Sequence, residues 1–140
     1  MDHANDISIR RFREPDLSQL ARLISETIGI SYAEVYPPRA VQFLKDFHSE
    51  TKIADRSKSG TTLVVEEDGE LVASGSLVDG EILAVFVQPR LQKGGRGRAL
   101  MRALEEEARA RGVSQIRLSS SLPSKKFYDS LGYKITEENR

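Results

Sequence analysis

The sequence predicts an α+β fold, α/β-like in having three layers, in which helices cover both faces of one mixed central sheet. Two features indicate this. Asp68-Gly69 and Asp79-Gly80 are hairpin signals, and they join three apolar strand segments that must pair in an antiparallel way. After the third strand, a helical pattern over 98–111 leads to another apolar strand, as in a parallel crossover. The 140 residues suit a single domain, 1–140.

The first half of the chain alternates between strand and helix patterns. Residues 7–12 alternate like a strand, and Pro15-Asp16 begins a helix whose apolar residues recur at helical spacing through Ile28. A loop is expected at 32–36 and a second helix at 38–48. A turn is expected at Ser57 to Gly60, before the first hairpin strand.

The second half contains the three hairpin strands and a helical region. The strands are expected at 61–66, 70–78 and 81–87. The helix over 98–111 stops at Gly112, and a buried strand follows at 115–119. A helix over 124–131 and a last strand from Tyr133 complete the order β-α-α-β-β-β-α-β-α-β.

Residues 85–98 are the most informative segment, because an apolar strand runs there into a basic, glycine-rich turn that opens the longest helix. Glycine lacks a Cβ atom, so Gly94, Gly95 and Gly97 let the backbone take positive φ and come close to a ligand. The helix start adds unpaired amides and a partial positive charge. No acidic residue separates the four cations of this region, which are Arg90, Lys93, Arg96 and Arg98. The combination predicts a pyrophosphate site.

Spacing decides against two familiar phosphate motifs. A P-loop requires Lys and then Ser or Thr after its last glycine, whereas Gly97 is followed by Arg98-Ala99. A dinucleotide fingerprint requires a small third residue, and the count from Gly95 and Gly97 falls on Leu100, which is large. The P-loop is therefore excluded and a Rossmann site is disfavoured.

Gln92, Gly95 and Gly97 match Gln/Arg-x-x-Gly-x-Gly/Ala, the acyl-CoA signature of the GNAT acetyltransferase superfamily, and the chain resembles that family elsewhere. Residues 85–89 are similar to its fourth strand, which ends in Val-x-Pro, and 127–133 are similar to its Phe-Tyr-x-x-x-Gly-Phe/Tyr segment. The resemblance covers 61–135 well and 8–55 by pattern only. It implies a GNAT-type sheet in which CoA binds between two splayed central strands.

The resemblance also implies acetyl-CoA as co-substrate and a set of site residues; no metal is expected, on the composition given below. Tyr128 is implied as the general acid that protonates the leaving thiolate, since a phenol with a pKa near 10 is still protonated at neutral pH. A bulge is implied to free main-chain groups of the fourth strand for the pantetheine arm and the thioester carbonyl. Ser121 stands where many members have Asn. The implied cofactor-binding residues are Val85, Phe86, Val87, Gln92, Lys93, Gly94, Gly95, Arg96, Gly97, Arg98, Ser121 and Ser124.

The residue that takes the proton from the amine is left open. Glu81 at the start of the same strand, Glu34 and His48 are candidates, acting directly or through water. Glu81 follows a hairpin signal, so a solvated strand end is an equal interpretation. We assign acceptor recognition to residues 27–50, because this region lies across the cleft from CoA in similar folds. Its polar and aromatic residues are Tyr32, Glu34, Tyr36 and Arg39.

Composition narrows the function classes. The chain has 21 acidic and 21 basic residues, and its basic cluster spans only one turn, so no nucleic-acid partner is expected. The absence of cysteine excludes disulfides and thiolate metal ligands. The two histidines are far apart in sequence, and no partners for a zinc site are found. Neither a membrane span nor a signal peptide is found, so a cytoplasmic location without membrane contact is expected.

These features together predict an N-acetyltransferase that moves an acetyl group from acetyl-CoA to a primary amine of a small molecule or protein, by direct attack in a ternary complex. One alternative is a non-catalytic acyl-CoA-binding sensor or interaction module with the same fold. A third option is a nucleic-acid accessory protein that uses residues 90–98. The sequence does not choose among a polyamine, an aminoglycoside, an amino acid and a protein amine, and it leaves a homodimer open.

Overall fold

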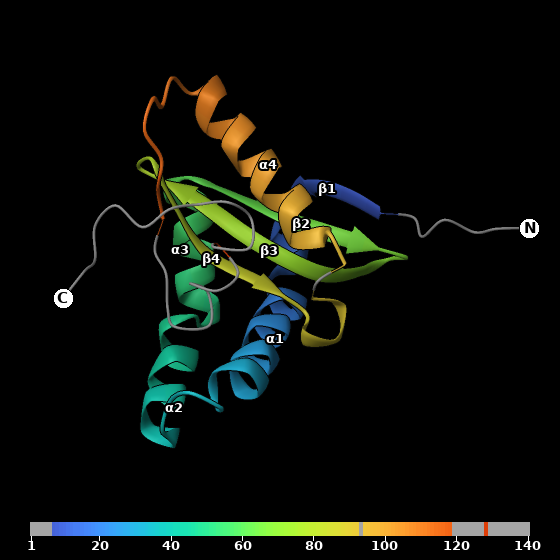
Figure 1. Cartoon of the computed structure of the whole chain (residues 1–140), viewed down its shortest axis with the longest axis vertical. Coiled ribbons are helices and arrows are strands. Elements are labelled where there is room, and N and C mark those ends of the chain that lie inside the picture. Colours follow the sequence, from blue (N-terminus) through green and yellow to red (C-terminus); the bar gives the residue numbers. More distant parts are fainter. Residues whose placement is uncertain (1–6, 93, 119–127, 129–140) are drawn as a thin grey trace, which may run out of the picture.

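Five strands form one mixed sheet in the computed structural model, which describes residues 7–92, 94–118 and 128. The sheet order follows the chain order (Figure 1). Strands β1 to β4 pair in an antiparallel way, and β5 lies parallel to β4, so the predicted mixed sheet is confirmed. The strands are β1 (Ile7–Arg11), β2 (Thr61–Glu67), β3 (Glu70–Val78), β4 (Glu81–Val87) and β5 (Arg117–Leu118).

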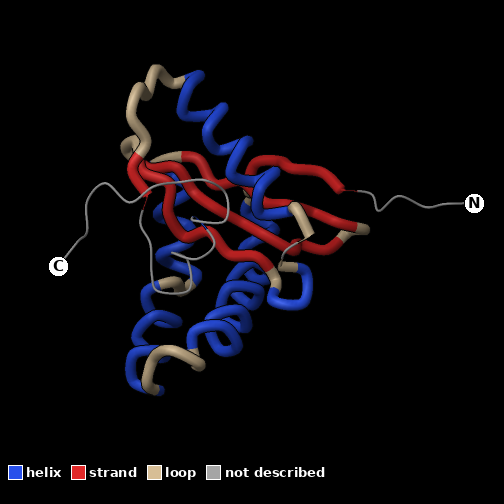
Figure 2. Tube along the Cα trace, viewed as in Figure 1, coloured by secondary structure: helices blue, strands red, loops and turns tan. Residues whose placement is uncertain are grey.

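Helices lie on both sides of this sheet, as predicted (Figure 2). Helix α4 (Arg96–Ala110) crosses one face. The other side holds α1 (Leu17–Thr27), α2 (Pro38–Phe47) and α3 (Glu50–Ser59). Three short helical turns connect these elements, namely η1 (Glu14–Asp16), η2 (Ile28–Tyr32), which is a π-helix, and η3 (Pro89–Leu91).

Each face of the sheet has its own hydrophobic core. Leu100 and Leu104 of α4 are fully buried in the first core, where they join Val65 of β2. Val64, the neighbour of Val65, belongs to the second core with Ile24 of α1. Side chains alternate between the faces of a strand, so β2 must be apolar at consecutive positions to supply both cores. Each fully buried Leu or Ile contributes about 1.5–3 kcal/mol relative to an exposed one.

Both predicted hairpin turns are confirmed by their backbone geometry. Asp68 and Gly69 have φ of 52° and 85°, and Asp79 and Gly80 have φ of 51° and 77°. Tight two-residue hairpins need positive φ at both central positions, which Asp and Gly tolerate better than most residues. The register of β2, β3 and β4 is therefore fixed locally.

The turn predicted at 57–60 is wrong, because α3 continues to Ser59. Ser49 caps this helix by accepting a hydrogen bond from the Lys52 amide, and Ile53 is its buried side chain. Its acidic first turn and basic last turn complement the helix dipole. Three α-helices, not two, therefore lie between β1 and β2.

The later elements differ in extent from the expectation. Helix α4 begins at Arg96, two residues earlier than predicted. The strand expected at 115–119 is described only over Arg117–Leu118, where Arg117 is exposed and Leu118 half-buried, so its described part is not the buried strand that the sequence favoured. The predicted helix over 124–131, apart from Tyr128, and the last strand lie outside the described residues.

Candidate active site

The connection between β4 and α4 forms the turn that the sequence singled out. Gly95 has φ of 88° and ψ of −6°, a left-handed conformation, and its carbonyl oxygen accepts the first helical hydrogen bond from Ala99 at 3.0 Å. The amides of Arg96, Gly97 and Arg98 therefore belong to the first turn of a 15-residue helix, where no carbonyl of the same helix can accept from them. The positive end of the helix dipole points to the same place, which favours an anion.

The cations of this turn do not all face solvent. Arg90 and Arg98 are exposed, and Lys93 lies outside the described residues. Arg96 is largely buried, and its guanidinium donates to both carboxylate oxygens of Glu67, at 2.6 and 3.0 Å. This hydrogen bonding raises the pKa of Arg96 above its ordinary value. The sequence grouped Arg96 with the exposed cations, but its charge is already paired.

Gln92, the first residue of the acyl-CoA signature, bonds to the strand that precedes it. Its Nε2 atom donates to the carbonyl oxygen of Val87 at 3.0 Å. This bond fixes the start of the turn relative to the end of β4. The positions of Ser121 and Ser124 lie outside the described residues.

Strand β4 carries a β-bulge, as the resemblance implied. Ser74 is opposite Phe86 and Ser76 is opposite Leu83, so Gly75 alone faces both Ala84 and Val85. Ala84 has φ of 55°, which is uncommon for a residue with a side chain. A Cβ atom on Gly75 would lie 2.9 Å from Leu104 Cδ1 and 3.2 Å from Val85 Cγ2, so a side chain here would require Leu104 to shift where α4 packs over the bulge.

The edge of β4 that faces away from β3 is paired only near its start, within the described residues. Glu81 is in register with Arg117 and Ile82 with Leu118. No described strand pairs with that edge over Val85 to Val87. A backbone edge at this place can hydrogen-bond an extended ligand.

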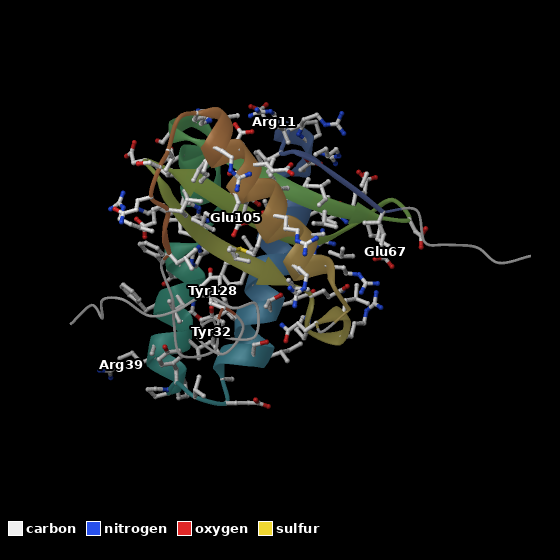
Figure 3. All side chains as sticks on the ribbon, turned by 45° about the horizontal axis from the view of Figure 1, so that its top comes forward. Arg11, Tyr32, Arg39, Glu67, Glu105 and Tyr128 are labelled. Carbon is white, nitrogen blue, oxygen red and sulfur yellow. The ribbon has the colours of Figure 1, made fainter. Side chains whose placement is uncertain are left out.

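Tyr128 is buried, with 5% of its surface exposed, and joins the core beneath α4. Burial, reinforced by the nearby Tyr32 phenol, raises its pKa above the ordinary value of a phenol. Tyr128 and Tyr32 are neighbours in Figure 3. The hydroxyl of Tyr128 is therefore protonated at neutral pH and can donate a proton.

An aromatic cluster that the sequence did not predict lies on the α1 side of β4. The ring of Phe86 is 6.3 Å from that of Tyr32 and 5.1 Å from that of His48, centroid to centroid. Tyr32 also contacts Tyr36, with centroids 5.9 Å apart. Of the residues predicted to recognise the acceptor, Tyr32 is buried and Tyr36 half-buried, whereas Glu34 and Arg39 are exposed.

The three candidate general bases, His48, Glu34 and Glu81, lie in different environments. Burial, with a contribution from Arg56, lowers the pKa of His48 to about 4, and its buried Nδ1 atom has no hydrogen-bond partner among the residues that the structure describes. His48 is therefore a packing residue with a weakly basic ring. Glu34 is exposed. Glu81 is half-buried, and strand alternation from Ile82 places it on the side of the sheet opposite α4, which is also the side of Phe86.

A cleft of about 210 Å³ lies between α1 and the end of β4. Its lining combines apolar side chains with one acidic and one basic residue at the surface, and consists of Leu23, Glu26, Thr27, Ile30, Gln88, Pro89 and Arg90. Within the described part of the chain, no group of three or more acidic or histidine side chains could hold a metal ion. No helix in that part is both long enough and apolar enough to span a membrane.

The sequence model of the protein family described as the acetyltransferase (GNAT) domain matches residues 32–140 of this chain. No curated protein matches the sequence. A GCN5-related N-acetyltransferase from Rhodopseudomonas palustris is 25% identical with a TM-score of 0.86, over 94% of this chain and 84% of that one. PaiA N-acetyltransferase from Thermoplasma acidophilum, solved in complex with coenzyme A, is 20% identical with a TM-score of 0.82, over 96% and 93%. An acetyltransferase from Trypanosoma brucei is 29% identical with a TM-score of 0.69, over 96% and 97%.

Proposed function

Because the chain belongs to the GNAT acetyltransferase family and is an acyltransferase, we propose that it transfers an acetyl group from acetyl-CoA to a primary amine within a ternary complex. One observation carries the proposal. A bulge at Ala84 and Val85, an edge of β4 over Val85 to Val87 that no described strand pairs with, and a left-handed glycine turn at a helix start follow one another along residues 84–98. Together they offer hydrogen bonds for a thioester, an extended arm and a diphosphate in that order.

The diphosphate of CoA binds at the start of α4 in this proposal. The amides of Arg96, Gly97 and Arg98 donate to its oxygens, and the exposed Arg90 and Arg98 side chains add positive charge. Lys93, Ser121 and Ser124 are proposed as further contacts of CoA. The pantetheine arm lies along the edge of β4 over Val85, Phe86 and Val87, where main-chain groups can pair with it as a strand would.

The reaction needs one stabilising donor, one acid and one base. The amine lone pair attacks the thioester carbonyl carbon, a C–N bond forms, and the developing oxyanion accepts a hydrogen bond from a main-chain amide of the bulge. The C–S bond then breaks, and Tyr128 gives its proton to the thiolate. The proton lost by the amine passes to Glu81 through a chain of water molecules.

The choice of Glu81 as base rests on its position in β4. It lies on the face opposite α4, four residues before Val85, which is roughly 13 Å along an extended strand. That separation is too long for direct contact with a thioester at the bulge, so a relay through water is required.

Glu81→Gln, which keeps the shape and removes the basic oxygen, is expected to lower kcat and to leave the affinity for acetyl-CoA unchanged. An unchanged kcat would exclude Glu81.

Thiol release from acetyl-CoA over a panel of amines tests the function. The panel contains a polyamine, an aminoglycoside, free amino acids and peptides with a lysine or an unblocked N-terminus. We expect thiol release with at least one class, and titration calorimetry should detect binding of acetyl-CoA without any amine. Failure to bind acetyl-CoA at millimolar concentration would refute the proposal, whereas binding without turnover on any amine would favour the sensor alternative.

A further inference from the structure

The ion pair between Glu67 and Arg96 joins two segments that are far apart in sequence. Glu67 is the last residue of β2, and Arg96 is the first residue of α4, between Gly95 and Gly97. The guanidinium Nε and Nη2 atoms each donate to a different carboxylate oxygen, which is the strongest arrangement for this pair of groups. The side chains are only 14% and 9% exposed, so water competes weakly for these bonds.

The same guanidinium also reaches the beginning of the turn. Its Nη1 atom is 3.4 Å from the carbonyl oxygen of Leu91, the last residue of η3. One side chain therefore links the end of β2, the start of the turn and the start of α4. The label of Glu67 in Figure 3 marks the end of β2 where this contact is made.

Gly94 makes room for this arrangement. A Cβ atom on Gly94 would overlap Arg96 Nη1 and would lie 3.3 Å from the Leu91 oxygen. A Cβ atom on Gly95, in contrast, would meet no atom of another described residue within 4 Å, apart from its two neighbours in the chain. The two glycines thus serve different purposes, since Gly94 admits the arginine side chain and Gly95 supplies the left-handed backbone.

We propose that Glu67 and Arg96 are positioning residues that hold the turn in its diphosphate-binding shape, and that Arg96 does not itself contact phosphate. This inference rests on the proposed function, because it assumes that the turn binds CoA. The guanidinium has both of its carboxylate-facing groups engaged in a nearly buried pair, and a phosphate could reach them only by displacing Glu67. Among the described cations of this turn, Arg90 and Arg98 are exposed and are suited to direct contact.

Glu67→Gln separates the two roles of Arg96 by the sign of its effect. If Arg96 only positions the turn, loss of the carboxylate loosens the turn and weakens CoA binding by about 10-fold, the equivalent of about one charge-assisted hydrogen bond. If Arg96 binds phosphate, the same change releases its guanidinium, and CoA binding stays equal or becomes tighter. The second result would overturn the inference.

Arg96→Gln and the double variant complete a thermodynamic cycle. We expect Arg96→Gln to weaken CoA binding as much as Glu67→Gln does, and the double variant to be no weaker than either. Additive losses would mean that Arg96 has an interaction with CoA apart from Glu67, and would contradict the proposal. Arg96→Lys keeps the charge without the planar geometry, so it should bind CoA as weakly as Arg96→Gln. Arg98→Gln is the control, because its loss should add to that of Glu67→Gln.

Two further measurements separate this inference from the proposed function and from a general loss of stability. With S-acetylpantetheine, which lacks the diphosphate, Glu67→Gln should leave KM unchanged, whereas KM for acetyl-CoA rises and kcat is kept. Amide hydrogen exchange without any ligand should become faster at residues 91–98 in Glu67→Gln. If the wild-type protein fails to bind CoA, the proposed function fails. In that case the positioning role is tested by exchange alone, and it is refuted if exchange at residues 91–98 is the same in Glu67→Gln as in the wild-type protein.

Discussion

Gly95→Ala tests whether the left-handed turn serves ligand binding or only chain reversal. The φ of 88° at Gly95 disfavours any residue with a Cβ atom, at a cost of about 1–2 kcal/mol. Apart from its chain neighbours, no described residue has an atom within 4 Å of the position that this Cβ would take, so no clash with the described part of the chain adds to that cost. For a chain of 140 residues, the expected fall in Tm is about 3–8 °C.

The loss of CoA affinity should exceed what stability explains. The new methyl group projects into the open space beside the first amides of α4, where the diphosphate is proposed to bind, and displaces one or two charge-assisted hydrogen bonds. Each such bond corresponds to about a tenfold or greater change in Kd. Titration calorimetry with acetyl-CoA, paired with thermal melting followed by circular dichroism, measures both effects.

Gly112→Ala is a matched control at the opposite end of the same helix. Gly112 has φ of 81°, and a Cβ there would also lie more than 4 Å from the other residues in the described ranges, its chain neighbours excepted. Its replacement should lower Tm by a similar amount and leave the affinity for CoA unchanged. The reasoning is refuted if the two variants bind CoA equally well, or if both lose affinity in proportion to their stability.

Three further expectations concern the acid, a buried carboxylate and the start of β2. Tyr128→Phe should lower kcat by about 10²–10⁴-fold, and an unchanged kcat would exclude Tyr128 as the acid. Because burial raises the pKa of Tyr128, ionisation of this residue should not lower the wild-type rate below about pH 10. Arg10 holds the pKa of Asp16 below its usual range, so the pair stabilises the fold at neutral pH, and this stabilisation disappears as the pH falls through the folded-state pKa. Asp16→Asn should therefore lower the free energy of unfolding by about 1–3 kcal/mol at pH 7 and by much less in acid, and equal losses at both pH values would contradict the linkage. Gly60→Ala should lower the free energy of unfolding, measured in urea, by about 3 kcal/mol or more, because the new Cβ would overlap the Leu77 carbonyl oxygen and lie 3.0 Å from Val78 Cα. A loss below about 1 kcal/mol would show that the backbone moves to admit the methyl group.

Local chemistry explains what could be predicted from the sequence. The Asp-Gly pairs mark two hairpins because few other residues tolerate positive φ at consecutive positions. The glycine-rich turn could be predicted for the same reason. Helix α3 was missed because Ile53 is its single buried residue, so an apolar stripe of helical period is absent and a cap and charges stabilise it instead.

Long-range contacts were not predictable from the sequence. Glu67 and Arg96 are 29 residues apart, and their contact depends on where β2 ends relative to the start of α4. From the sequence alone, Arg96 therefore could not be distinguished from the exposed arginines near it. The cluster of Tyr32, His48 and Phe86 was hidden in the same way, since each residue comes from a different element.

The bulge at Ala84 changes the parity of β4. Ile82 faces α4, and uninterrupted alternation would turn Phe86 to that face as well. The additional residue reverses the second half of the strand, so that Val85 and Val87 face α4 while Phe86 meets Tyr32 on the opposite side. After Glu81, every residue of β4 is apolar, so the sequence pattern does not reveal that the two halves of the strand face opposite sides. The one additional residue in β4 therefore decides whether the ring of Phe86 packs against Tyr32 or lies beneath α4.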